Sequence, residues 1–223
     1  MLWFKSYSFR CIDIGADMTK TLLLMRHGKS SWKDKKIPDY ERPLKKRGKA
    51  ASAEIGKILR ENELIPQAIL SSPALRASET AEIVAKESGF PGKITFIDSF
   101  YMAEPDVYID YLKGLDDSLE RVMIVSHNPG LEAFMQLLDG RLEALPTGSM
   151  AYLCLDINHW SDLSFETDAE LIGFWDAETE LEQKKEKETL EKEEKEMAKD
   201  KKDKKDKDHK KEKDGKKDKK SKK

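Results

Sequence analysis

Short apolar runs alternate with amphipathic segments along most of the chain, and this alternation predicts a layered fold. The run from Thr21 to Met25 has no charge on either face, so it predicts a strand that is buried on both sides. Later runs predict five further strands, at residues 68–70, 94–97, 122–126, 150–155 and 170–175. Apolar residues at helical spacing predict four helices, at residues 45–62, 78–88, 105–115 and 130–138. We therefore expect an α/β three-layer sandwich with a mostly parallel central sheet flanked by helices.

Side chains suited to phosphoryl transfer stand directly after three of these predicted strands. The residues are Arg26, His27 and Gly28 after the first run, Arg76 after the second and His127 after the fourth. The carboxyl ends of parallel strands share one edge of a sheet, which is where open α/β sheets bind ligands. Arginine offers a planar fork for phosphate oxygens, and histidine offers a nitrogen that attacks phosphorus or shuttles protons. The pattern therefore predicts a site for phosphoryl chemistry at this edge.

Four short blocks give the chain a resemblance to a known superfamily. They are RHGKSSW at residues 26–32, SSPALRASETA at 71–81, HNPG at 127–130 and LPTG at 145–148. In this order they resemble the histidine phosphatases, the superfamily that includes the phosphoglycerate-mutase-like enzymes, and within it the small SixA-type phosphohistidine phosphatases. The likeness covers roughly residues 20–176.

The resemblance implies roles for the residues at the predicted strand ends. His27 is the expected nucleophile, which forms a phosphohistidine that water later hydrolyses. Arg26, Arg76 and His127 are the expected cradle for the charge of the phosphoryl group. The further candidates for binding phosphate are Gly28, Ser30, Asn128 and Thr147. For the last three, an ordinary turn or surface role is the simpler interpretation.

The general acid is the part of the site that the sequence leaves open. Mutase-like relatives use a glutamate after the third strand to protonate the leaving oxygen, and here Glu104 and Asp106 occupy that segment. Either carboxylate equally suits the first turn of a helix, where it complements the helix dipole. Relatives of the SixA type often lack the acid. Histidine needs little help to leave, because the pKa of its conjugate acid is about 6.5.

The substrate that this comparison favours is phosphohistidine on a signalling or phosphotransfer protein. Lys33 follows Trp32 where mutases commonly have asparagine, which argues against a sugar-phosphate mutase. One alternative is a small phosphomonoester, with Glu104 or Asp106 as the acid. A second alternative is a phosphate-binding adaptor without catalytic activity.

The distribution of charge divides the chain into a catalytic part and a tail. From Glu178 onward there are 20 lysines and 16 acidic residues, a net charge of +4, so the −2 of the whole chain leaves −6 for residues 1–177. We expect an N-terminal extension at residues 1–19 and one histidine phosphatase domain at 20–176. A charged segment at 177–198 is expected to form a solvated helix, and the Lys- and Asp-rich tail at 199–223 is expected to be disordered.

Composition sets further expectations for location and partners. Cys11 and Cys154 do not suggest a disulfide framework, which favours a reduced cytoplasmic compartment. No apolar run has the length of a transmembrane helix, and residues 1–17 lack the apolar stretch of a signal peptide. No acidic cluster, Cys/His spacing or glycine-rich phosphate loop indicates a metal or nucleotide, so no cofactor is expected. Specific nucleic-acid binding is not expected, because acids interrupt the basic tail and aromatic residues are missing from it.

Overall fold

The computed structural model describes residues 20–33, 36–140 and 144–179, together with residues 181–182, 185 and 189–190. The predicted N-terminal extension and the predicted tail lie outside the described residues, as does most of the predicted helical segment. A compact unit ends at Glu178, and the chain from Thr179 onward is a second unit. Within the described ranges, no helix is long and apolar enough to span a membrane.

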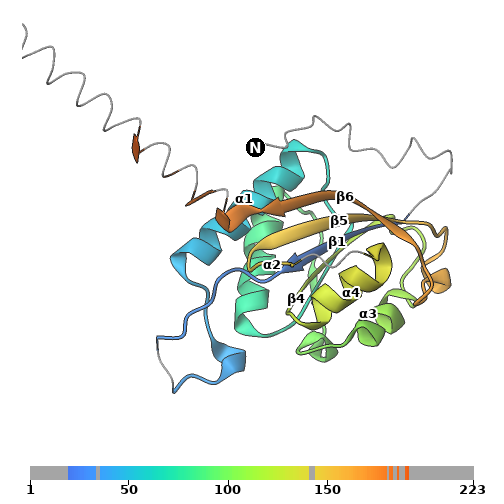
Figure 1. Ribbon diagram of the computed structural model, residues 1–223, viewed down its shortest axis with the longest axis horizontal. Coiled ribbons are helices and arrows are strands. Elements are labelled where there is room, and N and C mark those ends of the chain that lie inside the picture. Colours follow the sequence, from blue (N-terminus) through green and yellow to red (C-terminus); the bar gives the residue numbers. More distant parts are fainter. Residues whose placement is uncertain are drawn as a thin grey trace, which may run out of the picture. The chain divides into compact units, whose positions relative to one another are not determined.

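A six-stranded sheet with the order β3-β2-β4-β1-β5-β6 forms the centre of the compact unit (Figure 1). The strands are β1 (Lys20–Arg26), β2 (Ala68–Ser71), β3 (Ile94–Phe96), β4 (Arg121–Ser126), β5 (Ser149–Leu155) and β6 (Ala169–Asp176). The first four run parallel to one another, β5 is antiparallel to β1, and β6 is antiparallel to β5. The predicted mostly parallel sheet is therefore confirmed.

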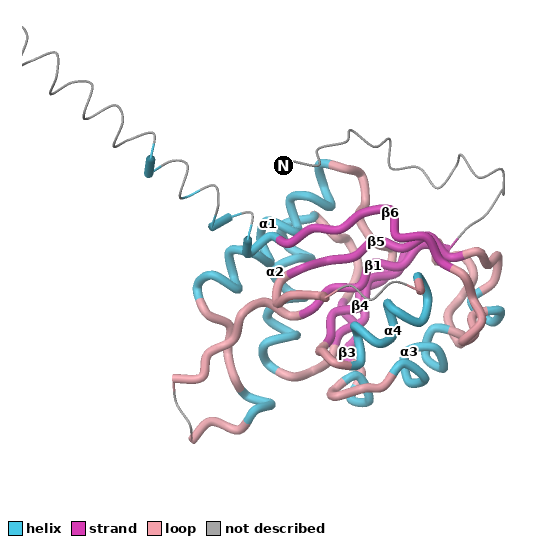
Figure 2. The backbone as a smooth tube through the Cα atoms, in the orientation of Figure 1, coloured by secondary structure: helices cyan, strands magenta, loops and turns pink. Residues whose placement is uncertain are grey.

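Helices cover both faces of this sheet, as the tube in Figure 2 shows. They are α1 (Lys46–Glu61), α2 (Leu75–Ser88), α3 (Pro105–Leu112) and α4 (Gly130–Asp139). The helices pack in pairs, α1 with α2 on one face and α3 with α4 on the other (Figure 1). The three-layer sandwich expected from the alternation of strands and helices is confirmed.

The ends of two helices illustrate how local sequence sets their bounds. α2 ends as predicted at Gly89, which has φ +76° and therefore adopts the left-handed conformation that glycine tolerates best. α3 begins at Pro105, as predicted, but ends at Leu112 rather than near residue 115. Beyond Leu112 the chain tightens into three-residue turns, since the Gly114 N–H bonds to Tyr111 O and the Leu115 N–H to Leu112 O.

Both faces of β1 are buried, which explains its unbroken apolar sequence. Leu22 and Leu24 belong to the hydrophobic cluster under α3 and α4, with Phe134 and Trp160 among its largest members. Because successive strand residues point to opposite faces, Leu23 lies toward α1 and α2, and it is also fully buried. β1 and its neighbour β4 are thus held on both sides, which fixes the position of the residues that follow them.

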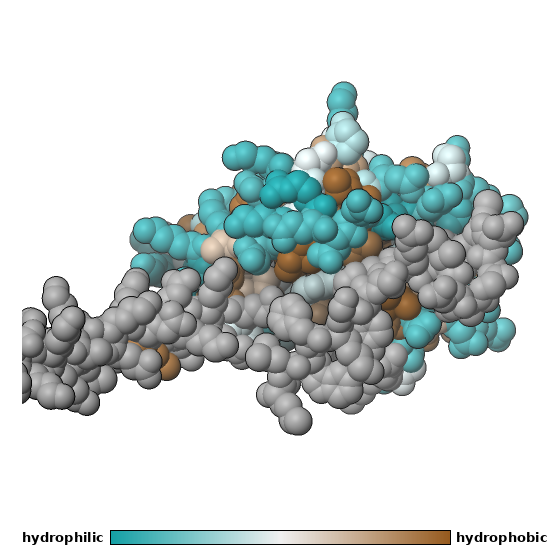
Figure 3. All heavy atoms as spheres, turned by 90° about the horizontal axis from the view of Figure 1, so that it is seen from above, coloured by the Kyte–Doolittle hydropathy of each residue, from teal (hydrophilic) through white to brown (hydrophobic). Residues whose placement is uncertain are grey.

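The described surface seen from above is mostly polar. In Figure 3 the coloured part of this view is largely hydrophilic, with hydrophobic patches between the polar side chains. β6 pairs with one neighbour only among the described strands, and its residues are partly or fully exposed rather than buried. The buried apolar layer therefore belongs to the central strands.

Candidate active site

Three parallel strands bring the predicted residues together at one edge of the sheet. His27 follows β1, His127 follows β4, and Arg76 is the second residue of α2, which follows β2. The register of the sheet aligns these ends, because Arg26 is opposite Ser126 in the ladder between β1 and β4. The His27 and His127 rings have centroids 5.0 Å apart, and Arg76 Nε lies 3.2 Å from His27 Nε2. The structure thus assembles the predicted nucleophile with one arginine and the second histidine.

The hydrogen bonds of His27 leave one ring nitrogen with a lone pair. Its Nδ1 donates to Gly28 O at 2.8 Å, so Nε2 accepts the Nε–H of Arg76. Burial lowers the pKa of His27 to about 3, and the charges of Arg76, Arg26 and Arg42 act in the same direction against the hydrogen bond to Gly28. The imidazole is therefore neutral at pH 7, which is the form that can attack phosphorus.

His127 is also held as a neutral side chain. Its Nε2 lies 2.8 Å from Ser72 Oγ, and its Nδ1 is buried with no hydrogen-bond partner among the described residues. Burial lowers the pKa of His127 to about 3, helped by nearby His27 and Arg76. A phosphoryl oxygen or a water molecule would satisfy this nitrogen and remove the cost of leaving it unpaired.

Arg26 reaches the site from the last residue of β1. Its Nη1 donates to Leu145 O at 2.9 Å, while its Nε is buried without a partner within the described part of the chain. Burial lowers the pKa of Arg26, and the carboxylates of Glu132 and Glu178 oppose that shift. Glu132 also accepts the Leu145 N–H at 2.8 Å, so it fixes the segment that positions Arg26. The unpaired Nε–H is a donor suited to an oxyanion.

Asp39 binds both terminal nitrogens of Arg76. The Nη1 of Arg76 donates to Asp39 O at 2.6 Å, and its Nη2 donates to Asp39 Oδ2 at 2.9 Å. Tyr101 donates to the same Oδ2 at 3.0 Å, and Arg42 pairs with the other carboxylate oxygen. Partial burial raises the pKa of Asp39, but the Tyr101 hydrogen bond and the charges of Arg76 and Arg42 outweigh it, so the net pKa is lowered. Asp39 is therefore ionised at pH 7.

The four further candidates for binding phosphate are bonded to protein groups. The Gly28 N–H donates to Thr80 Oγ1 at 3.0 Å, and Asn128 Nδ2 donates to Leu145 O at 3.0 Å. Ser30 accepts from Arg42, and Thr147 hydrogen-bonds to the carboxylate of Glu178. Their proposed contacts with phosphate stay predictions, and each of them braces a loop of the site.

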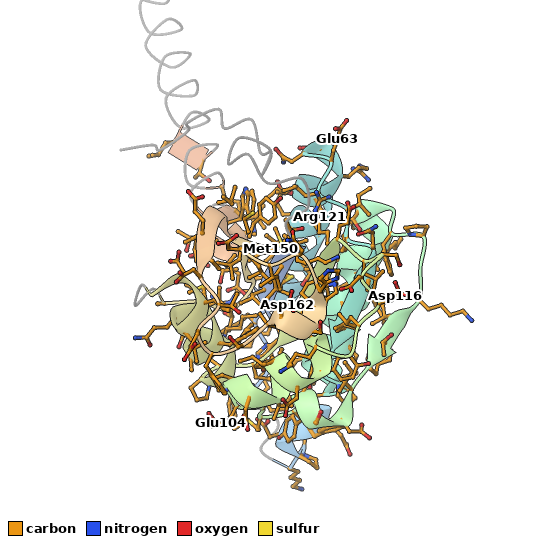
Figure 4. All side chains as sticks on the ribbon, turned by 90° about the vertical axis from the view of Figure 1, so that its right-hand side faces the viewer. Glu63, Glu104, Asp116, Arg121, Met150 and Asp162 are labelled. Atoms are coloured by element: carbon orange, nitrogen blue, oxygen red, sulfur yellow. The ribbon has the colours of Figure 1, made fainter. Side chains whose placement is uncertain are left out.

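The two candidate acids lie on the surface. Glu104 and Asp106 are exposed, and Glu104 lies at the periphery of the domain in Figure 4. Among the residues that the structure describes, neither carboxylate hydrogen-bonds to His27, Arg76 or His127. The same part of the chain has no group of three or more His, Cys, Asp or Glu side chains arranged to hold a metal ion.

Known proteins match the chain over the part that contains this site. The sequence pattern of the histidine phosphatase superfamily (branch 1) matches residues 22–98. An uncharacterized chloroplastic protein of Arabidopsis thaliana is 33% identical over 154 residues, which are 65% of this chain and 71% of that protein. An uncharacterized protein of Mycobacterium leprae is 32% identical over 163 residues, 67% of this chain and 98% of that protein.

The chain belongs to the histidine phosphatase superfamily. A crystal structure assigned as the phosphohistidine phosphatase SixA of Agrobacterium tumefaciens has the same fold, with a TM-score of 0.61 and 25% identity over 72% of this chain and 99% of that structure. Membership of this superfamily and the structural similarity support phosphatase chemistry. They do not identify the substrate. Because the plant relative is chloroplastic, a cytoplasmic location stays a prediction.

Three residues of this histidine phosphatase were not singled out from the sequence, namely Asp39, Tyr101 and Glu178. Asp39 begins the short 3-10 helix η2 (Asp39–Glu41) in a polar stretch, and its contact with Arg76 spans 37 positions. Glu178 accepts the Lys29 N–H at 2.8 Å across 149 positions and pairs with Arg47 at 3.8 Å. Burial raises the pKa of Glu178, against the effect of its hydrogen bond from Lys29. No local pattern of residues indicates these contacts.

Proposed function

We propose that this protein is a phosphatase that works through a phosphohistidine intermediate on His27, and that its substrate is phosphohistidine on a signalling or phosphotransfer protein. The observation that carries the proposal is the arrangement around Arg76, which bonds through its Nε–H to Nε2 of a neutral His27 and through Nη1 and Nη2 to an ionised Asp39. His27 thus has the neutral ring that a nucleophile needs, whereas Asp39 has no proton to donate to a leaving group.

The first step would move the phosphoryl group from one imidazole to another. A bond forms between phosphorus and His27 Nε2 while the bond between phosphorus and the substrate imidazole breaks, and the electron pair of the broken bond returns to the leaving nitrogen. The substrate ring, protonated on its other nitrogen, leaves as neutral imidazole. Arg76 and Arg26 would bind the equatorial oxygens, on which negative charge accumulates in the transition state. The bond that forms and the bond that breaks are of one type, so this step has no large thermodynamic barrier to overcome.

The choice of phosphohistidine over an alkyl phosphate follows from the leaving group. An alkoxide needs a proton donor as it departs, whereas imidazole is neutral and is weakly basic, with a conjugate-acid pKa of about 6.5. Asp39 has a lowered pKa and is held by Arg76 and Arg42, which makes it a poor proton donor at pH 7. Glu104 and Asp106 are exposed, and their role as the acid stays a prediction.

The second step would return the enzyme to its resting state. The oxygen of a water molecule bonds to phosphorus, the bond to His27 Nε2 breaks, and inorganic phosphate leaves. The electrons of the broken bond return to Nε2, and burial favours the neutral ring that results.

Intact-protein mass spectrometry after rapid mixing tests this proposal. We expect wild type to gain one phosphate when mixed with a phosphohistidine protein, and to gain it more slowly with an aryl phosphate. His27→Ala should gain none, whereas His159→Ala, which removes an exposed histidine paired with Asp117, should behave as wild type. Faster charging by the aryl phosphate would favour a phosphomonoesterase, and phosphate binding without any adduct or turnover would favour an adaptor.

A further inference from the structure

The loop and helix start that follow His27 concentrate positive charge on an otherwise acidic unit. From Lys29 to Lys49 the sequence has nine basic and three acidic residues, a net charge of +6. Residues 1–177 carry −6 as a whole, so the remainder of that part carries −12. A local excess of this size attracts negatively charged partners to one side of the molecule and repels them from the rest.

The stability of α1 does not explain these charges. Lys45 is its N-cap residue with no side-chain capping bond, and no acidic residue is present in its first turn. Cations at a helix N-terminus are unfavourable, by about 0.3–1 kcal/mol each, and Ser, Thr, Asp or Asn is the preferred cap. Arg47 and Lys49 have acidic partners, but Lys33 and Lys46 form no ion pair within the described part of the chain. A sequence that breaks a local rule at such a place points to a function.

Exposed apolar side chains lie beside the same residues. Trp32 is 68% exposed and Met102 is 58% exposed, and three more large apolar residues are exposed next to the site, namely Ile37, Tyr40 and Leu75. Leu75 precedes Arg76, and Met102 follows Tyr101, whose ring packs edge-on against His127 at 5.6 Å. Apolar groups that gather around a site mark a surface for binding another molecule.

Contacts join this surface to the loops that carry the site. The Lys45 N–H donates to Lys29 O at 2.7 Å, so the start of α1 is tied to the loop that follows His27. Tyr40 packs edge-on against Tyr101 at 5.0 Å, which joins the loop before α1 to the one after β3. We call the exposed set the basic rim; its members are Trp32, Lys33, Ile37, Tyr40, Lys46, Leu75 and Met102.

We propose that the basic rim is a docking surface for an acidic face of the protein that carries the phosphohistidine. This inference rests on the proposed function, because the rim borders the site proposed to accept the phosphoryl group. Lys33 and Lys46 would steer carboxylates of the partner toward the site, while aliphatic members such as Met102 would pack on its apolar residues. Its two aromatic members already pack on protein groups, Trp32 under the Arg42 guanidinium at 3.3 Å and Tyr40 against Tyr101 at 5.0 Å, and the other apolar members are aliphatic. This favours a protein surface over stacked bases.

Kinetics with matched substrates test the docking surface. The probes are free phosphohistidine and a small acidic protein phosphorylated on one surface histidine with phosphoramidate. We expect Lys33→Glu combined with Lys46→Glu to lower kcat/KM on the acidic protein by about tenfold, and to change it less than about twofold on free phosphohistidine. Added salt should lower the wild-type value on the acidic protein and leave the variant nearly unaffected, because salt screens the attraction.

Controls separate docking from folding and from total charge. Lys93→Glu combined with Lys113→Glu makes the same charge change at exposed positions before β3 and after α3, at the opposite edge of the sheet, and should act as wild type. Lys46→Glu alone should raise the unfolding temperature slightly, since an acid complements the start of α1. Met102→Asn tests the apolar contribution and tolerates the positive φ of this residue, +56°.

The outcomes distinguish the two proposals. If wild type hydrolyses neither phosphohistidine substrate, the proposed function fails and the docking surface fails with it. If wild type hydrolyses both and the rim variant equals the Lys93 and Lys113 control, only the docking surface fails. Equal losses of kcat/KM on both substrates would also overturn the docking surface. So would a single-stranded oligonucleotide that inhibits turnover of the acidic substrate as strongly as the unphosphorylated acidic protein does.

Discussion

At the residue scale, the orientation of Arg76 depends on Asp39. The guanidinium of Arg76 donates from Nη1 and Nη2 to Asp39 and from Nε to His27 Nε2. Asp39 therefore fixes the side of the guanidinium that faces away from His27. Arginine loses much rotamer freedom when it is held in this way, which prepares it for a planar phosphoryl group. Tyr101 and Arg42 hold Asp39 in turn.

We expect Asp39→Asn to lower kcat with phosphohistidine by about tenfold, which corresponds to about 1.4 kcal/mol of the activation barrier. KM should change less, because the substitution disturbs the orientation of Arg76 in the transition state and not the entry of substrate to the site. Steady-state kinetics measure both values. Asp162→Asn is the matched control, since Asp162 is an exposed acid in the short helix η4 (Trp160–Asp162), visible in Figure 4. An increase in kcat would mean that Asp39 blocks Arg76 instead of orienting it.

The site residues that stand at strand ends are the ones that the sequence predicts. His27, Arg76 and His127 could be singled out because a buried apolar run precedes each of them, and the topology then brings those ends together. Asp39 and Glu178 could not, because each belongs to a polar stretch and reaches the site through a contact distant in sequence. Such contacts depend on the path of a loop, which local periodicity does not encode.

At the element scale, a contact between two glycines joins α1 to the loop that follows His27. A Cβ added at Gly48 would lie 2.5 Å from Lys29 O, and one added at Gly28 would lie 2.7 Å from Gly48 O. The neighbouring atoms belong to the backbone, so they cannot rotate away as a side chain would. The close approach at Gly28 is thus an approach to the first turn of α1.

Gly48→Ala should therefore reverse the usual effect of this change in a helix. Alanine normally stabilises a helix by about 1 kcal/mol relative to glycine, but here the added methyl group forces α1 away from the loop after His27. We expect a net loss of about 1–3 kcal/mol in the free energy of unfolding, together with reduced turnover. Urea unfolding measures the first. Gly114→Ala, whose Cβ would come no closer than 3.6 Å to another residue, is the control, and equal stability of the two variants would refute the argument.

The central strands and the helices follow from the sequence because burial acts on each of them separately. β1 is apolar on both faces, and α1 and α2 present apolar stripes, so their patterns identify them without knowledge of their neighbours. The order of the strands and the antiparallel direction of β5 depend instead on which surfaces meet. The periodicity of apolar residues within one element does not indicate its neighbours. The end of α3 was missed for a related reason, since turns rather than a proline or a cap terminate it.

At the scale of the whole molecule, two neutral histidines buried in one site make stability depend on pH. Burial lowers the pKa of His27 and of His127 to about 3, whereas histidine in an unfolded chain has a pKa of about 6.5. Between these values the unfolded chain binds protons at both positions and the folded protein does not. The stability that these residues contribute is therefore complete above pH 6.5 and is lost as the pH falls toward 3.

We expect the free energy of unfolding to fall by up to about 2 kcal/mol per histidine between pH 7 and pH 5. Urea unfolding at several pH values, followed by tryptophan fluorescence, measures this slope. His27→Gln should reduce the slope, because one of the two protonation sites is removed, whereas His159→Gln replaces an exposed histidine and should leave it closer to that of wild type. Equal slopes for His27→Gln and wild type would show that His27 is not buried as a neutral group.

The same pKa values imply that the proposed nucleophile His27 stays neutral well below pH 6. Activity at acid pH should therefore be lost together with tertiary structure rather than before it.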